Sequence, residues 1–139
     1  QGKNVVQIGI ADFSNSPSYA ARARELGITV IPRSALRGRS VADVWAEAVS
    51  IAGNATDGIH VDFDVDVCDR AVVPACPAAA PGGISADELR QFAYLAGKSA
   101  AVRSMDITEI DATNDSSDER TVRLGALLIL EAAAGLAAR

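Results

Sequence analysis

Residues 59–74 read IHVDFDVDVCDRAVVP, an apolar segment that runs into a cluster of acidic residues. Its first six residues predict a β-strand that ends at Asp64. Side chains two positions apart on a strand point to the same face, so we expect the carboxylates of Asp64 and Asp66 to project together. Paired hard oxygen ligands suit a divalent metal ion. Asp64 and Asp66 are therefore the candidate metal ligands.

Apolar segments that alternate with helical segments define the expected fold. Strands are predicted over residues 5–10, 28–31, 59–64 and 102–107, and helices after Ser16 and over residues 40–52, 85–97 and 117–136. This alternation predicts an α/β fold, with a parallel sheet and helices on both of its faces. A chain of 139 residues is the size of one domain, so residues 1–139 are expected to form a single unit.

Composition argues against several classes of partner. A net charge of −5 without a basic tract gives no electrostatic footprint for nucleic acid or for an anionic membrane. The apolar stretch at residues 124–136 contains Glu131 and is too short to span a bilayer. Cys68 and Cys76 have neither metal-ligand nor redox spacing, so we expect free thiols and a cytoplasmic location.

The acidic cluster also admits readings other than a catalytic metal site. A calcium-binding EF-hand loop is excluded, because its glycine and glutamate positions, counted from Asp62, hold Val67 and Val73. A phosphatase of the haloacid-dehalogenase type would need a later lysine and an Asp-Asp motif, and neither is convincing here. A solvated acidic loop on a non-catalytic α/β domain remains open. Against it, converging carboxylates repel each other unless a cation or a hydrogen-bond donor offsets their charge.

Two further features bear on this cluster. His60 shares the expected strand face with Asp64 but lies roughly 13 Å from it along the strand, so we expect a partnered histidine rather than a metal ligand. A second acidic strand end, MDITEID at residues 105–111, carries Glu109. If the two strands are neighbours, Glu109 faces the same cleft as Asp64 and Asp66.

These motifs resemble the arginase, agmatinase and formimidoylglutamase group of dimanganese ureohydrolases. DVDVCDRAVVP at residues 64–74 is similar to the family's Asp-x-Asp-x-x-Asp-Pro signature, and PGGI at residues 81–84 to its Pro-Gly-Gly-Leu. DITE at residues 106–109 is similar to its Asp-Ile-x-Glu. PACP at residues 74–77 and IGIADFSNS at residues 8–16 resemble the formimidoylglutamase branch.

The resemblance implies an arginase-like three-layer fold and an amidine hydrolase that uses two manganese ions to activate water. It implies that Asp64 and Asp66 are metal ligands and that Glu109, Asp12 and Asn15 bind the substrate; no residue of this chain is implied as a catalytic acid or base. The implied reaction converts N-formimidoyl-L-glutamate to L-glutamate and formamide, a step of histidine breakdown. An agmatinase or guanidinobutyrase is the alternative within the family.

Departures from the family pattern set further expectations. Arg70 stands where many members have proline, and Ala11 where arginine is common. The family's other metal ligands come from Gly-Gly-Asp-His and Asp-Ala-His-x-Asp segments, which are absent, so the chain resembles the C-terminal half of a ureohydrolase. We expect it to bind manganese weakly or not at all and to be inactive alone. The family sheet places a strand from the other half between the first and third strands. We therefore expect either a rearranged sheet or self-association through unpaired edges, as a homo-oligomer or a self-associating fragment.

Overall fold

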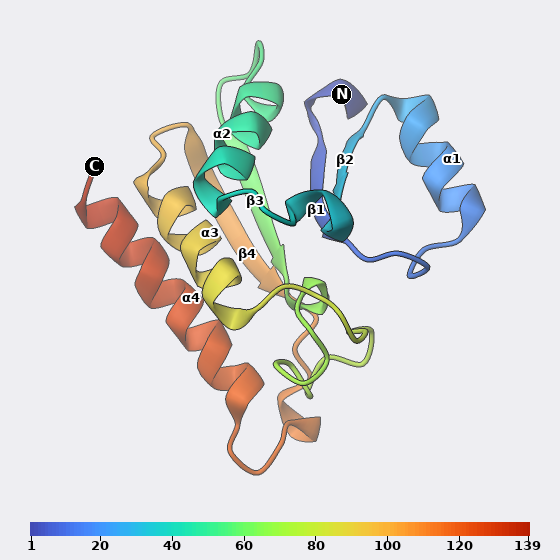
Figure 1. The fold of residues 1–139 in the computed structure, drawn as a ribbon. Helices are drawn as coiled ribbons and strands as arrows, with labels where there is room; N and C mark the ends of the chain where they lie inside the picture. Colours follow the sequence, from blue (N-terminus) through green and yellow to red (C-terminus); the bar gives the residue numbers. More distant parts are fainter.

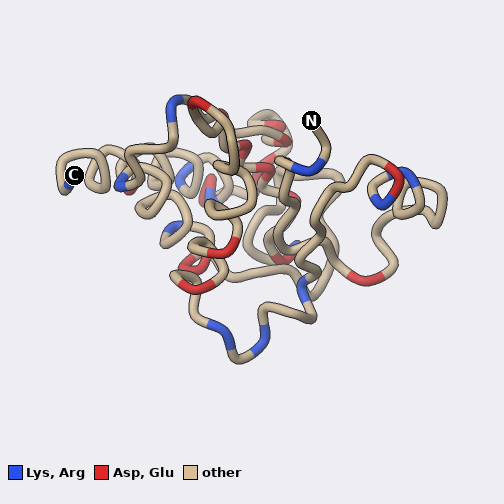
Figure 2. Tube along the Cα trace, turned by 90° about the horizontal axis from the view of Figure 1, so that it is seen from above, with Lys and Arg blue, Asp and Glu red and all other residues tan.

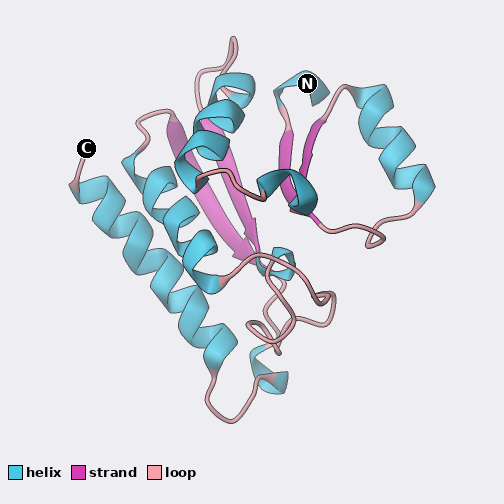
Figure 3. Cartoon of the chain, in the orientation of Figure 1, coloured by secondary structure: helices cyan, strands magenta, loops and turns pink.

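Strands and helices alternate along the whole chain (Figure 1 and Figure 3). The structure, a computed structural model, describes all residues from 1 to 139. The strands are β1 (Val6–Ile10), β2 (Thr29–Pro32), β3 (Ile59–Asp64) and β4 (Val102–Thr108). The α-helices are α1 (Pro17–Leu26), α2 (Val41–Ala52), α3 (Ala86–Lys98) and α4 (Arg120–Ala137). The predicted α/β class is confirmed.

The strands form two separate parallel pairs. β1 pairs with β2, and β3 pairs with β4, in a register that sets Asp64 beside Thr108. All four strands run in the same direction, so their carboxyl ends lie at one edge of the molecule (Figure 1). Parallel pairing was predicted, but one continuous sheet is not formed. The break between β1 and β3 lies where the family resemblance places a further strand.

A close contact nevertheless holds β1 near the carboxyl end of β3. Gly9 in β1 has a φ of +88°, and a Cβ atom there would lie 2.4 Å from Cγ2 of Val67. Val67 belongs to η3 (Val65–Val67), a short 3₁₀ helix that directly follows β3. Glycine allows this approach, because a side chain at position 9 would collide with the side chain of Val67.

Serine residues begin three of the four helices. Ser16, Ser40 and Ser85 each accept a hydrogen bond from a backbone N–H of the first turn. Glu88 completes a capping box with Ser85. These contacts satisfy helix N–H groups that have no partner within the helix. They explain why the boundaries predicted at these serines agree with the structure.

The last helix begins later than predicted. α4 starts at Arg120 rather than near residue 117, and no side chain caps it at Glu119. Instead, the carboxylate of Asp115 accepts hydrogen bonds from the N–H groups of Thr121 and Val122, at 2.9 and 3.0 Å. The preceding polar loop therefore caps α4 through Asp115.

One face of β3–β4 is buried under α2, α3 and α4. Phe63 of β3 packs in a core cluster that also contains Val44, Phe92 and Leu128. The opposite face is polar and exposed. There the imidazole of His60 lies 2.8 Å from Ser104 Oγ and 3.3 Å from Asp106 Oδ1. His60 is thus partnered, as predicted, but it lies on an open sheet face and not in the core.

Helices α3 and α4 pack side by side, and the first turns of the longer α4 extend beyond α3 (Figure 1). A Cβ atom at Gly97 would lie 2.0 Å from the carbonyl oxygen of Ala132, and one at Gly135 would lie 2.1 Å from that of Tyr94. The helices can approach this closely only because these positions lack side chains. None of the helices has the combination of length and apolarity that a membrane crossing needs.

Candidate metal and substrate site

The carboxyl groups of Asp64 and Asp66 lie together at the carboxyl end of β3. Asp64 is the last residue of the strand, and Asp66 lies in η3. The N–H of Asp66 donates a hydrogen bond of 3.1 Å to Asp64 Oδ1, and the carboxyl group of Asp64 contributes to the raised pKa of Asp66. The predicted pairing of the side chains is therefore present, but its cause differs. A 3₁₀ turn, not strand alternation, brings Asp66 to Asp64.

This pair carries negative charge that no cation of the chain offsets. Partial burial raises the pKa of Asp66 to about 6, and the negative charges of Asp64, Glu109 and Asp62 add to this effect. Acidic and basic residues are interspersed along the trace (Figure 2), yet none of the ion pairs includes Asp64, Asp66 or Glu109. A hard cation would relieve this repulsion.

Glu109 follows β4 and faces the same region. Its charge contributes to the raised pKa of Asp66, which means that the two carboxylates lie close enough to interact. Its backbone has a φ of +66°, in the left-handed region that residues other than glycine rarely occupy. Such conformations cost energy and are often found at binding sites. The sequence offered no sign of this conformation.

Asp12 and Asn15 lie on the loop between β1 and α1, at the same edge of the molecule. Both side chains are exposed, and neither takes part in any hydrogen bond or ion pair of the chain. No contact joins them to Asp64, Asp66 or Glu109. The structure therefore pairs Asp64 with Asp66, places Glu109 near enough for its charge to raise the pKa of Asp66, and leaves Asp12 and Asn15 free on a neighbouring loop.

The long loop after η3 is clamped by two residues that the sequence analysis did not assign to the site. Asp69 accepts hydrogen bonds from the N–H groups of Gly82 and Ala71, at 2.7 and 2.8 Å, and these bonds lower its pKa. Arg70 donates to the carbonyl oxygens of Cys76 and Pro77. Arg70 thus braces the loop at the position where many family members have proline.

The chain alone does not enclose a metal ion. No group of three or more His, Cys, Asp and Glu side chains converges closely enough to hold one. Cys68 and Cys76 are free and buried, and burial raises the pKa of the Cys68 thiol to about 12, so Cys68 is not poised to act as a thiolate ligand.

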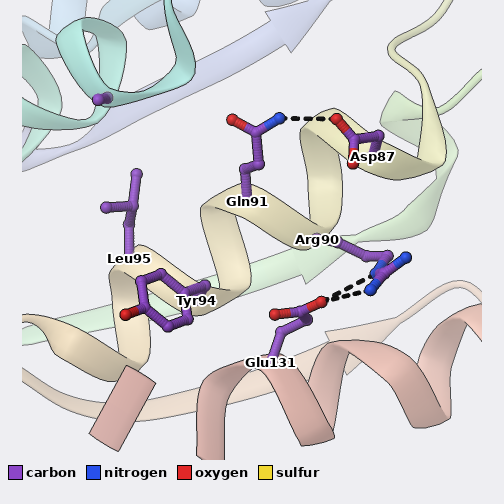
Figure 4. Close-up of a pocket in the computed structure, with 7 residues that line it drawn as sticks. Asp87, Arg90, Gln91, Tyr94, Leu95 and Glu131 are labelled. Carbon is purple, nitrogen blue, oxygen red and sulfur yellow. Dashed lines mark hydrogen bonds and ion pairs between the residues drawn. The ribbon is translucent and has the colours of Figure 1, made fainter. Parts of the chain in front are cut away.

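A separate hollow of about 240 Å³ lies over the helices (Figure 4). Arg90 of α3 reaches Glu131 of α4 across it, with Nε and Nη2 both donating to Oε1. The amide of Gln91 donates to Asp87 along α3. The hollow contains none of the predicted site residues, and of its polar contacts only the Arg90–Glu131 pair joins α3 to α4.

Comparisons with known proteins bear on the whole chain. A family model described as Arginase family matches residues 1–135. A formimidoylglutamase from Halalkalibacterium halodurans is 40% identical over 129 residues, which cover 93% of this chain and 40% of that protein. The crystal structure of formimidoylglutamase from Bacillus subtilis subsp. subtilis str. 168 has a TM-score of 0.92 at 31% identity, covering 98% of this chain and 42% of that one.

A formiminoglutamase structure from Trypanosoma cruzi with Mn2+ has a TM-score of 0.90 at 22% identity, covering 99% of this chain and 45% of that one. At that identity the likeness shows the fold alone. The chain spans about two-fifths of the length of the curated formimidoylglutamases from Halalkalibacterium halodurans and Bacillus subtilis that it matches.

Proposed function

The chain belongs to the arginase family, as its motifs predicted, and we propose that it is the C-terminal part of a manganese-dependent hydrolase of linear amidines. The proposed reaction is the hydrolysis of N-formimidoyl-L-glutamate to L-glutamate and formamide, a step of histidine breakdown in the cytoplasm. One observation carries the proposal. Asp64 and Asp66 hold their carboxyl groups together at a strand end without a cationic partner.

The donor set at this edge fits manganese. Carboxylate oxygens are the hard ligands that Mn2+ prefers, and a cation there would offset the repulsion that raises the pKa of Asp66. In this proposal Asp64 and Asp66 hold a pair of manganese ions together with ligands from outside these 139 residues. When bound, the metal supplies the Lewis acidity that activates water for hydrolysis.

The substrate is held by the chain's own polar groups. The carboxylate of Glu109 accepts charge-assisted hydrogen bonds from the cationic amidine and orients it. Its left-handed backbone fixes the direction of the side chain. Asp12 and Asn15, exposed and unpaired on the β1–α1 loop, supply further substrate contacts.

Two ligands do not enclose two cations, so the 139-residue chain alone is expected to bind manganese weakly or not at all and to be inactive. The unpaired strand edges and the exposed apolar face of α4 favour association, either with the remaining polypeptide or as a homo-oligomer.

The test is an assay of the complete protein, loaded with manganese, against formimidoylglutamate, agmatine and guanidinobutyrate. Formimidoylglutamate should have the highest kcat/KM, and Asp66→Asn should abolish its hydrolysis. Asp57→Asn, at an exposed position before β3, serves as the matched control and should leave the rate unchanged. Preference for a guanidine substrate would assign the protein to the agmatinase branch. No manganese-dependent hydrolysis of any of the three would favour a non-catalytic domain.

A further inference from the structure

Thr121 is the one polar side chain of the chain that is fully buried. It lies in the first turn of α4, and its hydroxyl uses both of its hydrogen-bonding capacities. It donates to Asp115 Oδ1 at 2.9 Å and accepts the N–H of Ala75 at 3.1 Å. The carboxylate of Asp115 therefore sets the direction of the hydroxyl proton, which leaves a lone pair of Thr121 aimed at Ala75.

Ala75 is held from its other side by the segment that carries Glu109. Its carbonyl oxygen accepts the N–H of Asp111 at 3.1 Å. Asp111 lies two residues beyond Glu109, whose backbone is in the left-handed region. A continuous path of hydrogen bonds thus runs from Thr121, through the peptide groups of Ala75, to the turn after β4. The loops involved lie side by side below the strands (Figure 1).

The same loop also lies within electrostatic reach of Asp66 and Glu109. Burial raises the pKa of the Cys76 thiol, nearby backbone N–H groups oppose this, and the negative charges of Asp66 and Glu109 add to the rise. Cys76 is the neighbour of Ala75 in the chain, so this piece of backbone lies within the field of both carboxylates. A shift of the backbone at residues 75 and 76 would therefore change its distance from the carboxylates of Asp66 and Glu109.

We propose that Thr121 is a positioning residue that holds Glu109 in place through the backbone of Ala75. The inference rests on the proposed function, because it takes Glu109 as the group that binds the amidine. A left-handed glutamate needs outside support to keep its conformation. The support comes from a buried hydroxyl 46 positions away from Ala75. Thr121 touches neither substrate nor metal in this account.

The test compares Thr121→Val with Thr121→Ser in the complete, manganese-loaded protein. Valine keeps the volume but cannot accept the Ala75 N–H, whereas serine keeps the hydroxyl. Thr121→Val should raise KM for formimidoylglutamate about tenfold while kcat falls much less, because small displacements of a binding group weaken its contacts. Thr121→Ser should retain the KM of the parent protein. A merely structural role would lower the active fraction without changing KM.

A second measurement does not depend on catalysis. Amide hydrogen exchange at Asp111 should be about tenfold faster in Thr121→Val than in the parent or in Thr121→Ser, because its acceptor Ala75 has lost its anchor. Thr56→Val, which removes an exposed hydroxyl that bonds Ala52, is the control and should change neither quantity. Asp115→Asn, which frees the hydroxyl proton, should act in the same direction if Thr121→Val does not fold.

Unchanged exchange at Asp111 in Thr121→Val, or equal effects of the valine and serine variants, would overturn the inference. If the parent protein hydrolyses none of the amidines, the proposed function fails instead. The exchange of Asp111 then still decides whether Thr121 holds this turn.

Discussion

Asp64 Oδ1 accepts the N–H of Asp66 at 3.1 Å, so the turn that ends β3 draws the second carboxyl group onto the first. A bond of this kind normally satisfies an N–H group that has no partner at the start of a helical turn. Here it also holds two acidic groups together where burial already disfavours the charge of Asp66. A cation such as the manganese proposed above would offset this cost.

The raised pKa of Asp66 predicts a pH-dependent effect of manganese. The folded-state pKa of about 6 lies above the unfolded value, so protonation stabilises the fold at low pH, and this stabilisation is lost as the pH rises through 6. Below that pH, manganese must displace the proton of Asp66. Above it, manganese offsets the repulsion between Asp66 and the neighbouring carboxylates. In the complete protein, manganese should therefore raise Tm more at about pH 7.5 than at about pH 5.

Differential scanning calorimetry with and without manganese measures this difference. Asp66→Asn should remove it, whereas Asp57→Asn should leave it intact. An equal manganese-induced rise in Tm at both pH values would show that Asp66 is not a ligand.

Two substitutions of Glu109 separate its predicted role in substrate binding from the strain of its left-handed backbone. Glu109→Gln keeps the backbone conformation and removes the charge, so KM for formimidoylglutamate should rise about 10- to 100-fold while the manganese content stays the same. Glu109→Gly should also lose binding but should raise the free energy of unfolding by about 1 kcal/mol, since glycine accepts the left-handed φ. Steady-state kinetics and urea unfolding measure the two effects. A lower stability of the glycine variant would argue against strain at this residue.

The close packing of α3 on α4 predicts unequal effects of two glycine substitutions. Gly97→Ala places a Cβ against the backbone of Ala132 and should lower the free energy of unfolding by about 1–3 kcal/mol. Gly125→Ala, the matched control in α4, meets only the end of the Ile110 side chain at 3.1 Å and gains helix propensity. It should be neutral or stabilising. Equal losses in both variants, measured by urea unfolding, would contradict the packing argument.

The exposed apolar face of α4 predicts self-association of the 139-residue chain. Ile129 and Leu130 are 63% and 64% exposed, and Ile129 borders an apolar groove of about 360 Å³ between α4 and β4. Sedimentation velocity should show dimers or larger species, and Ile129→Lys should shift the distribution towards monomer. Leu26→Lys, on the exposed helix α1, is the control. A strictly monomeric parent chain would rule this association out.

Local signals in the sequence account for most of the fold. The bounds of β3 agree with the structure because its apolar residues alternate and acidic residues end it. The capping box at Ser85 is likewise a contact between neighbours in sequence. The start of α4 and the buried hydroxyl of Thr121 could not be read in this way. The start of α4 depends on capping by Asp115, and the hydroxyl of Thr121 bonds Ala75, which lies 46 positions away in the chain.

The candidate site was predictable in part for the same reason. Motif spacing singled out Asp64, Asp66 and Glu109, and the structure pairs the two aspartates and sets Glu109 within electrostatic reach of Asp66. Spacing does not report backbone conformation, so neither the 3₁₀ turn at Asp66 nor the left-handed Glu109 could be foreseen. Asp12 and Asn15 were chosen by resemblance, and the chain alone provides no contact that draws their loop over the aspartates.

The most direct measurement is anomalous diffraction at the manganese edge from crystals of the complete protein. Peaks are expected in contact with carboxylate oxygens of both Asp64 and Asp66, and they should be lost in a crystal of Asp66→Asn. Manganese bound elsewhere, or peaks that persist unchanged in the variant, would contradict the assignment of these two residues as metal ligands.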